Sequence, residues 1–161
     1  MESLQYEIVR LPAYRAIGLK WDGSYSEVGQ LKEVIKEMAE RVHELEDVIS
    51  PEIQLGLSYH HRPDGFTHYS VFKAGNNQFV PKGMAEIFVP ELTYLTTQHV
   101  KGQNIGQTYM NIQQWLKESG YRIYKEDGID YYDDLPIKHE KYPVSRDLTD
   151  PHFEILIPIV K

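Results

Sequence analysis

The feature that most constrains the fold of this 161-residue chain is an internal repeat. The segment EIVRLPAYRAIGLKWDGSYSEVGQLKEVIKEM near the N-terminus resembles EIFVPELTYLTTQHVKGQNIGQTYMNIQQWLKES in the second half. With small gaps, Pro12 aligns with Pro90 and Tyr14 with Tyr94. A unit that occurs twice must form two similar substructures. We therefore predict one domain over residues 1–161, built from halves at about 1–80 and about 81–161.

The first half shows a strand pattern followed by a helix pattern. Residues 5–20 read as a strand interrupted near Pro12, because proline cannot donate to a sheet. A long helix is predicted from Ser26 to about Ile49, where apolar residues recur every three or four positions. Ser24 and Glu27 form a predicted capping box before this helix. Residues 53–61 and 67–74 flank a Pro-Asp-Gly turn and are predicted to pair as a hairpin.

The second half repeats this order. Residues 84–100 read as a strand with an internal proline, and a helix is predicted from Ile105 until Gly120 ends it. Two strand patterns follow at Lys138–Val144 and Phe153–Val160. Each half thus predicts strand, helix, strand, strand. We predict an α+β fold with antiparallel sheets, pseudo-two-fold symmetry and a ligand cleft between the halves.

The composition excludes several classes of protein. Seventeen basic and 24 acidic side chains give a net charge of −7, which disfavours binding to nucleic acid. The chain has no cysteine, so disulfides, thiol catalysis and cysteinyl metal sites are excluded. The N-terminal residues show no secretory signal, and no apolar run is long enough to span a membrane. We expect a cytoplasmic protein that binds neither nucleic acid nor membrane.

The polar and charged motifs indicate no metal, cofactor or catalytic residue. His60 and His61 are adjacent on a predicted strand, so they point to opposite faces and cannot readily share a metal ion. Ser58 lacks the glycine-rich elbow of a serine hydrolase, and the chain has no phosphate-binding glycine loop. The acidic segment from Glu126 to Asp134 lacks the spacing of an EF-hand and is predicted to be a solvated loop.

Four segments together resemble a known family. They are VPKGMAEIFVPELTYLTTQHVKG, TYMNIQQWLKESGY, IKHEKYPV and FEILIPIVK, and they occur in the expected order over essentially the whole chain. The chain resembles the GyrI-like small-molecule-binding domain, which is also the effector-binding domain of multidrug-sensing transcription activators. The resemblance starts within the first ten residues, so we expect a standalone member without the DNA-binding part of those regulators.

The resemblance implies a function and two site residues. Multidrug-sensing relatives bind bulky, often cationic, aromatic compounds in a cleft between the halves. Their penultimate strand carries a glutamate in an aromatic pocket, and Glu140 matches it. Tyr25 matches a pocket tyrosine at the start of the first helix. Lipophilic aromatic cations are therefore the expected partners, because a carboxylate among aromatic rings favours a cation with apolar rings.

Strand and helix periodicity extend this set. Tyr142 shares a strand face with Glu140, and Phe153 on the next strand could approach it. The remaining candidates for ligand binding are Trp21, Tyr59 and Tyr109. The 12 tyrosines of the chain suit such a wall, since each ring is apolar and carries a hydroxyl.

Alternative interpretations stay open at this point. Each tyrosine could be ordinary core, and Glu140 could pair with Lys138 or Lys141. Some relatives hydrolyse electrophilic compounds in the same kind of aromatic cage, where Glu140 could activate water. GyrI itself contacts a protein target, which an acidic surface could also do. Binding of a small molecule without catalysis is our first hypothesis.

Overall fold

The computed structural model describes residues 6–100, 102–144 and 152–161. Along the chain the elements are β1 (Glu7–Leu11), β2 (Tyr14–Ser24), η1 (Tyr25–Gln30), α1 (Leu31–Arg41), η2 (Val42–Glu44), β3 (Ile53–Arg62), β4 (Gly65–Ala74), β5 (Ala85–Val89), β6 (Leu92–His99), α2 (Ile105–Ser119), β7 (Arg122–Ile123), β8 (Ile137–Pro143) and β9 (Phe153–Val160). The expected α+β class is confirmed.

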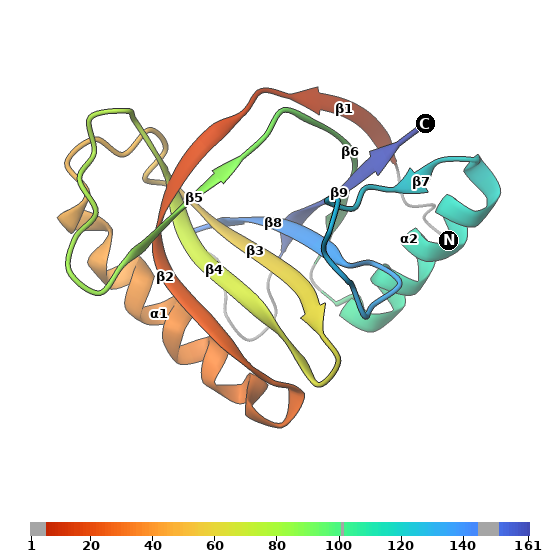
Figure 1. Ribbon diagram of the computed structural model, residues 1–161, viewed down its shortest axis with the longest axis horizontal. Helices are drawn as coiled ribbons and strands as arrows, with labels where there is room; N and C mark the ends of the chain where they lie inside the picture. The colour runs from red at the N-terminus through yellow and green to blue at the C-terminus, as the bar shows by residue number, and fades with distance from the viewer. Residues whose placement is uncertain (1–5, 101, 145–151) are drawn as a thin grey trace.

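The described strands form a single curved antiparallel sheet (Figure 1). Their order is β1-β6-β9-β8-β3-β4-β2-β5, and β7 pairs with β9 outside this path. β3 of the first half and β8 of the second half pair in the middle of the sheet. α1 and α2 lie at opposite sides of the molecule. The two halves therefore meet at the centre of the sheet and also near its two ends, where β1 pairs with β6 and β2 with β5.

The register shows which residues share a face of the sheet. Directly paired residues lie side by side on one face, so the row Ser70, Gly56, Glu140, Ile155, Thr97 crosses five strands on the same side. α1 covers one end of this side through a cluster with Ile17, Met38 and Phe72, and α2 covers the other through Ile112, Leu116 and Ile155. We call this side of the sheet the helix-side face. Glu140 lies between the two covered ends.

The opposite face carries a third cluster. Its buried members include Ala16, Leu57, Val89, Tyr94 and Leu156, from five different strands. Residues from strands near both ends of the sheet pack together there, so this is the inner side of the curve. The stability of the protein depends on three apolar clusters, two under helices and one within the curved sheet.

The first helical segment is shorter than predicted. The chain forms a 3₁₀ turn from Tyr25, the α-helix ends at Arg41, and a second 3₁₀ turn ends at Glu44. The prediction of a helix up to Ile49 was wrong because the following segment pairs with β4: Val48 bridges Ala74, and the Ile49 amide donates to the Lys73 carbonyl at 2.9 Å. Apolar spacing alone cannot distinguish a last helical turn from a segment that pairs with a neighbouring strand.

Other local predictions are confirmed. The chain leaves the sheet at Pro12 and Pro90, which separate β1 from β2 and β5 from β6. β3 and β4 form the expected hairpin. The capping contact is present as a bond from the Ser24 amide to Glu27, 3.2 Å long. The two-residue strand β7 was not predicted, since two residues carry no periodicity.

The N-cap of α2 allows a first test of the local energetics. The Asn104 side chain accepts a bond from the Gln107 amide at 3.0 Å. We expect Asn104→Ala to lower the free energy of unfolding by about 1 kcal/mol, because one amide at the helix start loses its partner. Urea unfolding measures this. The exposed loop residue Asn77 supplies the control Asn77→Ala, and equal effects of the two changes would contradict the capping role.

No helix in the described part of the chain is long and apolar enough to cross a membrane.

Candidate functional site

Glu140 occupies the middle of β8 on the helix-side face. Its register partners are Gly56 of β3 and Ile155 of β9. The side chain is half-buried. A strand from each half of the chain thus contributes to the immediate surroundings of this carboxylate.

Two tyrosine hydroxyls donate to the carboxylate from different elements. Tyr109 of α2 donates to Oε2 of Glu140, and Tyr142 of β8 donates to Oε1. The Phe153 ring lies 4.7 Å from the Tyr142 ring, measured between centroids. Burial, and then the Glu140 charge, raise the pKa of Tyr109 well above its ordinary value, so the hydroxyl keeps the proton that it donates. We call Glu140, Tyr109, Tyr142 and Phe153 the Glu140 group.

Gly56 allows Tyr142 to lie close to the sheet. A Cβ at position 56 would stand 3.1 Å from Cε2 of Tyr142 and 3.1 Å from Cε1 of His68. Both rings therefore cover the glycine, and the Tyr142 hydroxyl reaches back to Glu140 on its own strand. Glycine in a strand interior is typical of such a close approach.

A second aromatic group lies on the same face, around Phe66. Its ring centroid is 5.2 Å from Trp21, 5.8 Å from Tyr25 and 4.8 Å from His60. Tyr25 is 45% exposed, whereas Trp21 is 8% exposed, so the tyrosine lies at the surface and the tryptophan beneath it. We call Trp21, Tyr25, His60 and Phe66 the Phe66 group.

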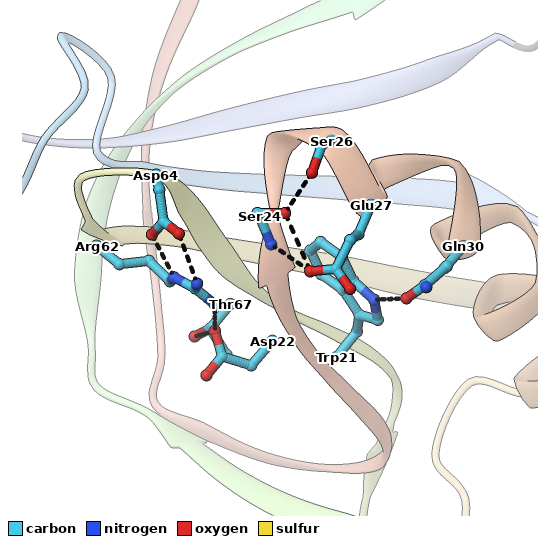
Figure 2. A network of polar contacts seen from close by, with 9 residues as sticks. All are labelled: Trp21, Asp22, Ser24, Ser26, Glu27, Gln30, Arg62, Asp64 and Thr67. Atoms are coloured by element: carbon cyan, nitrogen blue, oxygen red, sulfur yellow. Dashed lines mark hydrogen bonds and ion pairs between the residues drawn. The ribbon is translucent and has the colours of Figure 1, made fainter.

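Polar contacts hold the chain where it passes from β2 into η1 (Figure 2). The Trp21 indole donates to Gln30 at 3.0 Å, which fixes the ring against the helical segment. Arg62 bridges the hairpin to β2 through Asp64 at 2.9 Å and Asp22 at 3.0 Å. The amide of Tyr25 donates to the Asp64 carbonyl. The turn between β3 and β4 thus fixes the backbone from which Trp21 and Tyr25 project.

Lys138 links the two groups. Its Nζ lies 5.4 Å from the centroid of the Tyr109 ring, 3.2 Å from Nε2 of His60 and 3.5 Å from Oδ1 of Asp133. Burial first, and then the Lys138 charge, lower the pKa of His60 to about 4, so His60 is neutral at pH 7. This surface therefore combines aromatic rings with the carboxylates of Glu140 and Asp133 and the ammonium group of Lys138.

Further polar side chains lie on the central strands beside Gly56. His68 Nδ1 and the Ser58 hydroxyl are 2.9 Å apart, and the Gln54 amide donates to Ser70 at 2.7 Å. Burial lowers the pKa of His68 to about 4, so this ring is neutral as well. The middle of the helix-side face is thus polar and aromatic, unlike its aliphatic ends.

The structure brings six of the seven predicted residues to the helix-side face and leaves one apart. Tyr59 lies on the opposite face, where its hydroxyl is 3.2 Å from Nε2 of His139 and its ring meets Tyr69 edge to face. Tyr59 lies in phase with Leu57 on β3, and this phase is the reason that it points away from Glu140.

Sequence reasoning missed Lys138, His60, Phe66 and Asp133. Lys138 shares its strand phase with Glu140, and that signal was available. Asp133 belongs to the segment predicted as a solvated loop, yet its side chain turns toward Lys138 and His60. Pairing of β8 with β3 brings Lys138 close to His60, and no local pattern in the sequence predicts this contact.

Two other features of the described residues bear on ligands. No three His, Cys, Asp or Glu side chains gather there in a way that could hold a metal ion. A cavity of about 70 Å³ opens toward the inner side of the sheet. Its lining includes Leu57, Tyr94 and His139, which point away from the helices, and Glu140 also borders it.

Comparison with known structures shows a shared fold. The C-terminal domain of EcmrR has 14% sequence identity and a TM-score of 0.67, with 98% of each chain covered. The structure of SAV2435 bound to tetraphenylphosphonium has 14% identity and a TM-score of 0.68, covering 97% of this chain and 94% of that one. A hydrolase encoded by lin2189 from Listeria innocua has 10% identity and a TM-score of 0.57, covering 97% and 92%.

The sequence itself assigns the family. No curated protein matches the chain. The model of the GyrI-like small molecule binding domain matches residues 4–159, nearly the whole chain, as the four segments and the central glutamate led us to expect. The chain belongs to the GyrI-like small-molecule-binding domain family.

Proposed function

We propose that this domain binds hydrophobic, multi-ring organic cations between its two halves, with Glu140 as the counter-charge. The observation that carries the proposal is the Glu140 group: a half-buried carboxylate held by two tyrosine hydroxyls at the centre of the sheet. The solved structure of SAV2435 with tetraphenylphosphonium supports this class of ligand for the family fold.

The contacts of Glu140 suit a site that accepts a cation. A carboxylate removed from water needs hydrogen bonds or an opposite charge. Tyr109 and Tyr142 supply hydrogen bonds in the protein alone. A lipophilic cation would add the opposite charge, while its rings would pack on Tyr142 and on the exposed ring of Tyr25. Rigid rings with adaptable hydroxyls favour recognition of a class of compounds over one exact shape.

The position of the site fits a duplicated fold. The strand order around the centre is β6-β9-β8 on one side and β3-β4-β2 on the other. With the two-residue strand β7 left aside, the second and fourth strands of each half, β2 with β4 and β6 with β9, pair in the same way. We infer that the halves are related by a pseudo-two-fold axis near the β3–β8 pair. A cleft between the halves then lies between the N-terminus of α1 and the exposed side of α2.

Two isosteric ions provide the test of this proposal. Tetraphenylphosphonium and tetraphenylborate share shape and apolar area but have opposite charges. Calorimetric titration should show that the phosphonium binds and that the borate binds at least about tenfold more weakly, because Glu140 attracts one ion and repels the other. Equal affinity for the two ions would contradict the role of Glu140 as counter-charge.

The variant Glu140→Gln tests whether the preference for the phosphonium over the borate depends on this one residue. It should weaken phosphonium binding by about tenfold or more and reduce the difference between the ions. Glu154→Gln is the matched control, since Glu154 lies one residue before Ile155, faces the other way and pairs with Lys141 at 3.8 Å. Equal losses in both variants would indicate only a general effect of net charge. Mass spectrometry of recovered electrophilic ligands tests the hydrolytic alternative.

A further inference from the structure

Lys138 is a cation already present beside the proposed ligand. It lies two residues before Glu140 on the same face of β8. Its side chain is 20% exposed, and its Nζ lies over the ring of Tyr109, 5.4 Å from the centroid. The hydroxyl of the same ring donates to Glu140. One tyrosine therefore contacts the resident ammonium with its face and the carboxylate with its hydroxyl.

The partners of Lys138 hold its charge in this place. An ammonium only donates hydrogen bonds, so Nε2 of His60 must accept from it. Neutral His60 then carries its proton on Nδ1, which donates to the Tyr25 hydroxyl at 3.1 Å. Asp133 adds an opposite charge 3.5 Å from Nζ. The ammonium is therefore fixed by groups from η1, β3 and the loop before β8.

We propose that Lys138 is a specificity-determining residue that sets the cation affinity of this site. This inference rests on the proposed function. A ligand cation attracted to Glu140 must come close to the ring face that Lys138 occupies, and it meets the repulsion of a like charge there. The resident ammonium lowers the affinity for all cations, so only those with a large aromatic body bind well.

Substitution of Lys138 with neutral and charged side chains tests this role. Lys138→Met keeps an apolar stem and removes the charge, so tetraphenylphosphonium should bind about tenfold more tightly. Lys138→Arg keeps the charge and should bind it within about twofold of wild type. Lys141→Met is the matched control: it removes the same charge from the opposite face of the same strand and should change affinity less than about twofold.

A further variant keeps the test valid if Lys138→Met folds poorly. Lys138→Gln removes the charge but keeps a polar amide that can donate to His60 and Asp133, so it should also bind tetraphenylphosphonium about tenfold more tightly. Thermal unfolding of every variant checks that the fold is retained.

The outcomes separate the two proposals. If Lys138→Met and Lys141→Met bind no more tightly than wild type while Glu140→Gln binds more weakly, the role of Lys138 is overturned and the proposed function stands. If neither wild type nor Lys138→Met binds the phosphonium, both fail. Tighter binding by Lys138→Met alone supports the role, and equal tightening by Lys141→Met contradicts it.

Discussion

Acidification from pH 7 to pH 5 is expected to lower the free energy of unfolding by about 4 kcal/mol through His68 and His139 alone, because these two buried histidines cannot take up protons in the folded protein. Burial lowers the pKa of His139 to about 3 and that of His68 to about 4. Both histidines are buried, and each is only 4% exposed. In the unfolded chain each histidine has an ordinary pKa of about 6.5.

The direction of this change in stability follows from proton uptake. Between the folded and unfolded pKa values, the unfolded state binds more protons, so stability falls as the pH falls below about 6.5. Each histidine contributes a slope of about 1.4 kcal/mol per pH unit in this range. Urea unfolding at pH 7, 6 and 5 measures the slope.

Two variants test whether this pH dependence of the unfolding free energy comes from the buried histidine rings. His139→Gln retains a group that can meet the Tyr59 hydroxyl and should reduce the slope by about 1.4 kcal/mol per pH unit. His61→Gln, at the exposed neighbour of His60, should leave it unchanged. A wild-type protein with constant stability between pH 6.5 and pH 5 would contradict the buried, neutral state of these histidines.

The second large effect is expected from removal of both hydroxyls that donate to Glu140. The double variant Tyr109→Phe/Tyr142→Phe should lose about 3–5 kcal/mol of unfolding free energy at pH 7, since a hydrogen bond to a charged group contributes about 1.5–3 kcal/mol. The rings remain, so packing against Phe153 is preserved. The loss should shrink when Glu140 is replaced by Gln, because a neutral amide gains less from the two donors than a carboxylate does.

Urea unfolding at pH 7 of this variant and of wild type, each with Glu140 intact and with Glu140→Gln, provides the comparison. Tyr132→Phe serves as control, because Tyr132 is 51% exposed and should lose little in either background. A double variant as stable as wild type, or a loss that is the same in both backgrounds, would show that the two hydroxyls do not stabilise an ionised Glu140.

Much of the fold could be predicted because its signals are local. Pro12 and Pro90 interrupt strands wherever they stand, and the turn chemistry before Gly65 defines the hairpin of β3 and β4. The end of α1 could not be predicted in the same way. Val48 continues the helical spacing but pairs with Ala74, and the free energy of that tertiary contact exceeds a weak local preference.

The site shows the same division between local and long-range information. Strand phase correctly places Glu140 and Tyr142 on one face, and it also places Tyr59 with Leu57 on the other. The contact of Tyr109 with Glu140 spans 31 residues and depends on how α2 packs over β9. The inward turn of Asp133 has no pattern in a segment rich in acidic residues.

A crystal structure of the complex with tetraphenylphosphonium would show whether a lipophilic cation binds beside Glu140 on the helix-side face. We expect the phosphorus within about 6 Å of the Glu140 carboxylate, with a phenyl ring against Tyr142. A phosphonium bound at the inner cavity beside Tyr94 and His139, or bound only at the outer surface, would contradict this expectation.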